Sequence, residues 1–140
     1  MSGPTPNRDG WKDGELAALP AIPPFPEFTD FERLALDSIA KEFGPEEGAF
    51  REQVLNCRVI DRINTVVGFY TRVMVDRSVC PPVAIDFKGA NFEVEHVEYG
   101  VGVILWGNDG YLGEIEGFTF GNNGLCGQSL ATLRLLGRSP

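Results

Sequence analysis

Apolar residues recur every three to four positions between residues 29 and 43, which predicts one amphipathic helix. Thr29 and Glu32 have the spacing of a capping box at its start, and Gly44-Pro45 would end it. Pro45 also suits the first turn of a second, shorter helix. The apolar stripe consists of Phe31, Leu34, Ala35, Ile39, Ala40 and Phe43, and the second helix would turn Phe50, Val54 and Leu55 inward.

From about Val66 the apolar period changes to two, which predicts β-strands. In the first strand one apolar face is formed by Val67, Phe69, Thr71, Val73 and Val75. Further strands are expected at residues 83–87, 92–99, 101–106 and 111–120, with a turn or bulge at residues 88–91. The last two strands would form a hairpin, because Asn, Asp and Gly at residues 107–110 tolerate the positive φ of a tight turn. A short helix is expected at residues 129–136.

Helices followed by a run of short strands predict an α+β domain rather than a parallel βαβ sheet. The expected architecture is a two-layer sandwich, an antiparallel four- to five-stranded meander with the N-terminal helices on one face and a short C-terminal helix. Residues 28–140 would form this single domain. Residues 1–27 hold six of the ten prolines and are expected to form an extended or disordered arm, because proline removes backbone donors.

Composition narrows the class of protein. The 140 residues are 43% hydrophobic and 23% charged, which is typical of a soluble globular domain. No apolar run approaches the ~20 residues of a membrane helix, and the N-terminus lacks a secretory signal, so a cytoplasmic location is expected. The formal net charge of −8 argues against nucleic acid and anionic membranes as partners.

Negative charge is concentrated on the predicted strands. Seven acidic residues and one lysine lie between Asp86 and Glu116, a net charge of −6 in the segment (1 − 7). If helices cover one face of the sheet, alternation places Glu114 with Glu116, Glu93 with Glu95, and Tyr70 with Arg72 on exposed positions. A solvated acidic face is the simplest interpretation. A carboxylate site for a divalent cation or for acid/base chemistry is another.

A third interpretation is a docking surface for a basic protein partner, because aromatic side chains amid charge are typical of interfaces. The expected partner-binding residues are Tyr70, Arg72, Glu93, Glu95, Trp106, Tyr111, Glu114, Glu116 and Phe118. Self-association into a homodimer is a further candidate.

An alternative site would be a small-molecule or catalytic pocket near His96, Tyr111, Glu116 and Cys126. His96 is the only histidine, and its alternation with Phe92 and Val94 turns it toward the core, where a structural hydrogen bond is the simpler role. One histidine cannot build a multi-histidine metal site, and phosphate-loop and nucleophile-elbow motifs are absent, so no metal or cofactor is expected.

The cysteines at positions 57, 80 and 126 form no CxxC pair. Their sparse, odd number suits a reducing compartment, and burial as small apolar residues is the expected role of all three. Cys126, between Gly124 and Gly127, is the favoured candidate if one thiol is reactive.

The segment GVGVILWGNDGYLGEIEGFTFG, residues 100–121, resembles a segment of small uncharacterised bacterial proteins with the pattern G-x-G-x-x-L-x-x-x-D-G-Y-L-x-x-x-E-G-x-T-x-G. The matching positions are Gly100, Gly102, Leu105, Asp109, Gly110, Tyr111, Leu112, Glu116, Gly117, Thr119 and Gly121. This resemblance implies no activity. Size, acidity and architecture also resemble those of immunity proteins that neutralise toxins. The leading hypothesis is a non-catalytic protein that binds a protein partner through an acidic, aromatic sheet face.

Overall fold

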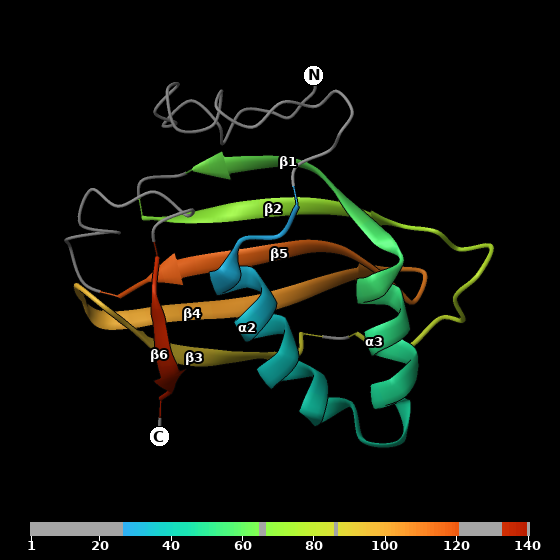
Figure 1. The fold of residues 1–140 in the computed structure, drawn as a ribbon, viewed down its shortest axis with the longest axis horizontal. Coiled ribbons are helices and arrows are strands. Elements are labelled where there is room, and N and C mark those ends of the chain that lie inside the picture. The colour runs from blue at the N-terminus through green and yellow to red at the C-terminus, as the bar shows by residue number, and fades with distance from the viewer. Residues whose placement is uncertain (1–26, 65–66, 86, 121–132, 140) are drawn as a thin grey trace.

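The computed structural model describes residues 27–139 apart from residues 65–66, 86 and 121–132. It has an α+β fold in which helical segments precede the strands (Figure 1). The helical segments are α2 (Asp30–Ala40), the 3-10 segment η2 (Lys41–Glu46) and α3 (Glu47–Leu55). The strands are β1 (Cys57–Asn64), β2 (Gly68–Val75), β3 (Gly89–Val94), β4 (Val97–Asn108), β5 (Tyr111–Thr119) and β6 (Leu135–Arg138).

Both predicted N-terminal helices are present, and local chemistry sets their ends. The Thr29 backbone N–H donates to Glu32 Oε1 at 2.8 Å, and the Glu32 backbone N–H donates to Thr29 Oγ1 at 3.2 Å, which completes the capping box. Gly44 interrupts the helical path with a φ of 57°, a conformation that glycine adopts without strain. The inward placement of Leu34 and Leu55 was wrong, since both side chains are exposed on the helix surfaces.

Within the described residues the sheet has six antiparallel strands in the order β1-β2-β5-β4-β3-β6, rather than the four or five of a simple meander (Figure 1). Sequence periodicity predicted neither edge strand. β1 contains Arg58, Asp61 and Arg62 and therefore lacks an apolar alternation. β6 replaces the end of the predicted C-terminal helix at Leu135 and Leu136, and residues 129–132 lie outside the described residues.

Three further assignments, two of strands and one of a turn, also differ from the prediction. Residues 83–85 form no strand. Val83 and Ile85 are nevertheless buried, because a loop turns their apolar side chains into the core. Residues 92–99 are not one strand but the end of β3, a turn and the start of β4. His96 lies in that turn with a φ of 66° and is exposed, so its expected position beside the core was wrong. Gly89 to Asn91, expected in a turn or bulge, belong to β3.

The predicted hairpin between β4 and β5 is confirmed. Asn108 pairs with Tyr111, which leaves a two-residue loop of Asp109 and Gly110. Their φ values are 57° and 87°, and positive φ at both central residues defines a type I′ turn. The hairpin places β4 and β5 side by side in the middle of the sheet.

The helices lie across one face of the sheet (Figure 1). Phe31 on α2 packs edge-on against Phe69 of β2 and Phe92 of β3, with ring centroids 5.9 and 6.4 Å apart. The predicted inward residues of β2, namely Phe69, Thr71, Val73 and Val75, are buried, whereas Val67 is exposed. None of the described helical segments packs on the opposite face, which is called the open face below.

Candidate functional site

The sheet register brings most of the predicted partner-binding residues together on the open face. Tyr70 on β2 lies directly opposite Glu116 on β5, and Arg72 lies opposite Glu114. On the other side of β5, Trp106 of β4 also lies opposite Glu114. These five residues and the neighbouring Phe118 are called the open-face cluster. Alternation along each strand places them on the same side, as the sequence predicted.

Glu116 is the hydrogen-bonding centre of the open-face cluster. Its Oε1 accepts from the Trp106 indole Nε1–H at 2.9 Å, and its Oε2 accepts from the Tyr70 hydroxyl at 3.3 Å. One carboxylate therefore orients two aromatic rings that come from strands on opposite sides of β5. The arrangement holds the rings in place while both side chains are partly exposed, since Trp106 is 39% exposed and Tyr70 is half-buried.

Exposed aromatic surface extends outward from this centre. The Phe87 ring packs edge-on against Trp106, with centroids 5.1 Å apart, and is itself 71% exposed. Phe118 packs edge-on against Phe120 at 5.4 Å. Large aromatic side chains left in water next to one another are unusual unless they serve an interaction.

Charge in the open-face cluster is negative but partly compensated. Arg72 donates to both carboxylate oxygens of Asp61 on β1, with Nε 2.7 Å from Oδ1. This hydrogen bonding raises the pKa of the Arg72 guanidinium. Together with Asp61, the cluster contains three carboxylates and one guanidinium, a net charge of −2 (1 − 3). Burial and the charge of Glu116 raise the pKa of the Tyr70 hydroxyl, which therefore stays protonated at neutral pH.

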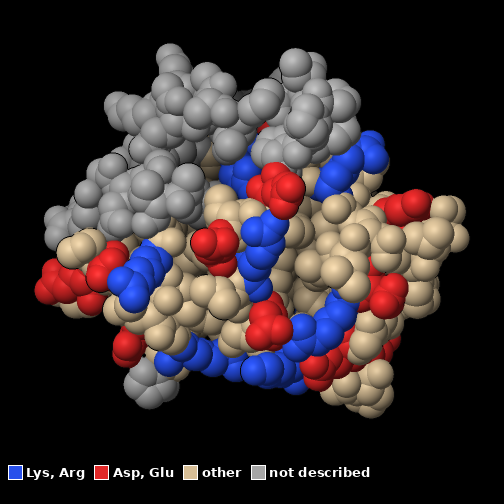
Figure 2. Space-filling view, viewed as in Figure 1, with Lys and Arg blue, Asp and Glu red and all other residues tan. Residues whose placement is uncertain are grey.

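The helix-covered side has a different charge pattern. Figure 2 shows lysine and arginine side chains interleaved with acidic ones on this side. Many of them form ion pairs between elements, such as Arg51 with Asp37 and Arg138 with Glu42. Exposed pairs of this kind contribute little to stability. Between Glu27 and Glu52 the helical segments carry eight acidic and three basic residues, a net charge of −5 (3 − 8), so this side is acidic as well.

Three predicted partner-binding residues lie away from the open-face cluster. Glu93 is exposed on β3, two strands from β5. Glu95 follows β3 and pairs with Arg134 at 3.7 Å. Tyr111 lies at the hairpin end of the sheet, where its hydroxyl donates to the Cys80 carbonyl at 3.1 Å and the Arg77 guanidinium lies over its ring. The structure thus does not gather all of the strand carboxylates on one surface.

Phe87 and Asp61, which border the cluster, were not predicted from the sequence pattern. Phe87 was placed inside a strand that does not form, and Asp61 belongs to β1, which periodicity did not reveal. The only available signal was the charge match between Asp61 and Arg72 across the short β1–β2 connection, and this signal is too common to identify a pair.

The residues of the alternative pocket do not come together. His96 immediately precedes β4, and Tyr111 pairs with Asn108 at the other end of that strand. A strand of 12 residues is about 35 Å long, so these two side chains cannot line one pocket. Glu116 lies between them on the open face, and Cys126 lies outside the described residues.

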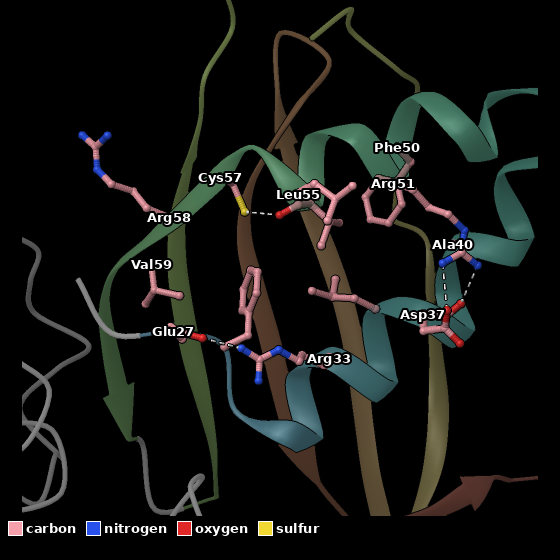
Figure 3. A pocket seen from close by; sticks show the side chains of 13 residues that line it. Glu27, Arg33, Asp37, Ala40, Phe50, Arg51, Leu55, Cys57, Arg58 and Val59 are labelled. Atoms are coloured by element: carbon pink, nitrogen blue, oxygen red, sulfur yellow. Dashed lines mark hydrogen bonds and ion pairs between the residues drawn. The ribbon is translucent and has the colours of Figure 1, made fainter. Parts of the chain in front are cut away.

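A groove of about 560 Å³ lies between α2, α3 and β1 on the helix-covered side (Figure 3). Leu36, Phe50, Val54 and Val59 are among its apolar lining residues. Its rim includes two ion pairs, Arg33 with Glu27 and Arg51 with Asp37, each at 2.8 Å. The groove therefore offers apolar surface with a balanced rim.

The Cys57 thiol in the groove wall is unsuited to nucleophilic chemistry. It donates to the Val54 carbonyl at 3.3 Å, and burial raises its pKa to about 12. A thiol with that pKa is protonated at neutral pH, and the thiolate is the reactive form. Burial also raises the pKa of Cys80, which is in the core.

No family model, curated protein or solved structure matches this chain. In the described part of the chain, no three His, Cys, Asp or Glu side chains converge in a way that would hold a metal ion. Among the same residues, none of the helices has the length and hydropathy needed to cross a membrane.

Proposed function

We propose that this protein is a non-catalytic binding protein that recognises a protein partner through the open-face cluster. The observation that carries the proposal is the Trp106–Glu116–Tyr70 arrangement, in which a central carboxylate orients two partly exposed rings. The proposal assumes a two-layer arrangement in which helices cover only one face of the sheet. It also assumes that the protein meets its partner in the cytoplasm.

Preorganisation is the physical reason to favour a protein partner. Trp and Tyr supply large contact areas, and they lose little conformational entropy when a hydrogen bond already fixes the ring. The six-stranded sheet below them is a rigid platform, because every strand of the cluster is paired on both sides. Tryptophan, tyrosine and arginine are the residues most enriched among those that dominate binding energy at interfaces.

The open-face cluster matches the active site of an enzyme less well than it matches a binding surface. Both oxygens of Glu116 accept hydrogen bonds from ring groups, and the Tyr70 hydroxyl is held protonated. General acid/base chemistry needs a group whose pKa lies near the working pH. These contacts describe a surface that is fixed in shape rather than one prepared for proton transfer.

The test compares capture from cell extract by three immobilised proteins: wild type, Trp106→Ala and Leu34→Ala. Leu34 is a matched control because it is an exposed large apolar residue on the helix-covered side. We expect a partner captured by wild type and Leu34→Ala but lost by Trp106→Ala. With the purified partner, calorimetry should show an affinity loss of about 30-fold or more for Trp106→Ala, the range of an interface hot spot.

Retention of every captured protein by Trp106→Ala would contradict the proposal, provided that circular dichroism shows a folded variant. A second copy of the chain is one protein that this surface could bind. Light scattering over a dilution series identifies that case, because a homodimer dissociates as concentration falls.

Neutralisation of a toxin is a specific form of this function. Its support is the acidic composition, with a net charge of −8, together with small size, since opposite charge accelerates the encounter with a basic partner. Coexpression with the product of a neighbouring toxin gene tests it. Growth should be rescued by wild type and Leu34→Ala and not by Trp106→Ala, and equal rescue by all three would contradict it.

A further inference from the structure

We infer that the open-face cluster receives an arginine side chain of the partner, with the guanidinium stacked on Trp106 and bonded to Glu116. This inference rests on the proposed function and adds the chemistry of the contact. It follows from three features of the described residues, which are the local charge, the exposed ring surface and the remaining bonding capacity of the Glu116 carboxylate.

The first feature is a local excess of negative charge. Glu114 and Glu116 are two residues apart on β5, and their side chains lie on the same side of the strand. The nearby guanidinium of Arg72 is bonded through Nε and Nη2 to Asp61. A charge of −2 remains when Asp61 and Arg72 are counted with the two glutamates. A cation on the partner would complement this charge.

The second feature is an aromatic surface beside these carboxylates. The indole N–H of Trp106 is bonded to Glu116, which fixes the ring next to the negative charge. Phe87 packs edge-on against the same ring and extends the apolar surface. A cation over a tryptophan face gains from the negative ring quadrupole, even at an exposed site.

The third feature selects arginine rather than lysine. Each oxygen of Glu116 accepts one described hydrogen bond from a ring group and has capacity for another. A guanidinium is planar and weakly hydrated, so it can stack on an indole and donate sideways to carboxylates at the same time. An ammonium group is compact and strongly hydrated, and it cannot use the flat ring surface in this way.

The experiment measures small probes on the full-length chain, without the partner. Trp11→Phe leaves Trp106 as the only tryptophan, so its fluorescence reports on the cluster. The probes are the N-acetyl amides of arginine, lysine and citrulline, the last being the neutral isostere of arginine. We expect saturable binding of the arginine probe, and binding about 5- to 10-fold weaker for citrulline and for lysine.

Matched variants separate the cluster from net charge. Glu116→Gln should weaken binding of the arginine probe about 5- to 10-fold, because it removes a charge-assisted contact. Glu93→Gln removes the same charge at an exposed position on β3 and should leave binding unchanged. Circular dichroism of each variant confirms folding.

Equal binding of arginine and citrulline, equal binding of arginine and lysine, or equal weakening by Glu93→Gln and Glu116→Gln would each overturn the inference. The proposed function is tested separately. If Trp106→Ala loses the protein partner while the probes show no arginine preference, the binding function stands and the arginine contact is wrong. If Trp106→Ala keeps all partners, the binding function itself is wrong.

Discussion

On the helix-covered face, Glu32 is fully buried between Arg62 and Thr71, whereas on the open face Glu116 is half-buried between Trp106 and Tyr70. Glu32 accepts from Arg62 Nη2 at 2.6 Å, from Arg62 Nε at 2.9 Å, from the Thr71 hydroxyl and from the Thr29 backbone. Its bonding capacity is used within the fold. Glu116 accepts from two ring groups and has capacity left for a ligand.

The difference shows how burial decides the role of a carboxylate. A buried ion pair cannot exchange its partners for water, so removal of one partner leaves an uncompensated charge. A carboxylate at the surface loses little when a neighbour is removed, because water replaces the neighbour. We therefore expect changes at Glu32 to affect stability and changes at Glu116 to affect binding.

The largest expected effect is that of Glu32→Gln. It leaves Arg62, which is 3% exposed, without its counter-charge, and should lower the free energy of unfolding by ~3–5 kcal/mol. Urea denaturation measures the loss. The double variant Glu32→Leu with Arg62→Met should recover most of it, since a buried pair replaced by apolar groups is often neutral. A decrease in the free energy of unfolding of less than ~1 kcal/mol would show that the Glu32 carboxylate contributes little to stability.

An intermediate effect is expected at two glycines that face opposite sides of the sheet. A Cβ at Gly117 would overlap the Phe69 ring in the core, and a Cβ at Gly102 would overlap the Phe118 ring on the open face. Phe69 is fixed by core packing, so Gly117→Ala should cost ~1–3 kcal/mol. Phe118 is half-buried and can rotate outward, so Gly102→Ala should cost less than ~1 kcal/mol. Equal losses in thermal unfolding would contradict the distinction between the faces.

The smallest effect on stability is expected for Glu116→Gln, which should change the free energy of unfolding by less than ~0.5 kcal/mol. Its measurable consequence is at Tyr70. Burial raises the pKa of Tyr70 most, and the charge of Glu116 raises it further by disfavouring the phenolate. Glu116→Gln should therefore lower the pKa of Tyr70, as NMR of labelled tyrosine can follow. An unchanged pKa would mean that Glu116 and Tyr70 are not in contact, and Glu93→Gln is the control.

Sequence patterns predicted the elements whose ends depend on neighbouring residues. The capping box at Thr29, the break at Gly44 and the Asp109-Gly110 turn each involve residues close together in the chain, and each is present. Alternation also predicted that Glu114 and Glu116, and Tyr70 and Arg72, share a face. These features require only the period of the strand and the preferences of the turn residues.

The sequence could not predict elements that depend on distant partners. β1 contains a buried arginine, Arg62, which is compatible with a strand only because Glu32 lies 30 residues earlier and packs above it. β6 forms at the sheet edge and pairs with β3, a strand that lies about 40 residues earlier in the chain. The apolar alternation changes phase by one residue between residues 94 and 97, and this shift, which was not interpreted as a boundary, coincides with the turn at Glu95 and His96.

The sequence by itself determined the α+β class, the N-terminal helix, the central hairpin and the acidic character of the chain, because composition, period and turn chemistry are local properties. Only the tertiary structure decided which residues meet on the open face. Strand order placed Tyr70 and Trp106 on either side of Glu116 and kept His96 and Tyr111 apart. The physical reason is that pairing between non-sequential strands, stabilised by burial of the other face, fixes the register and thereby the neighbours of each exposed side chain.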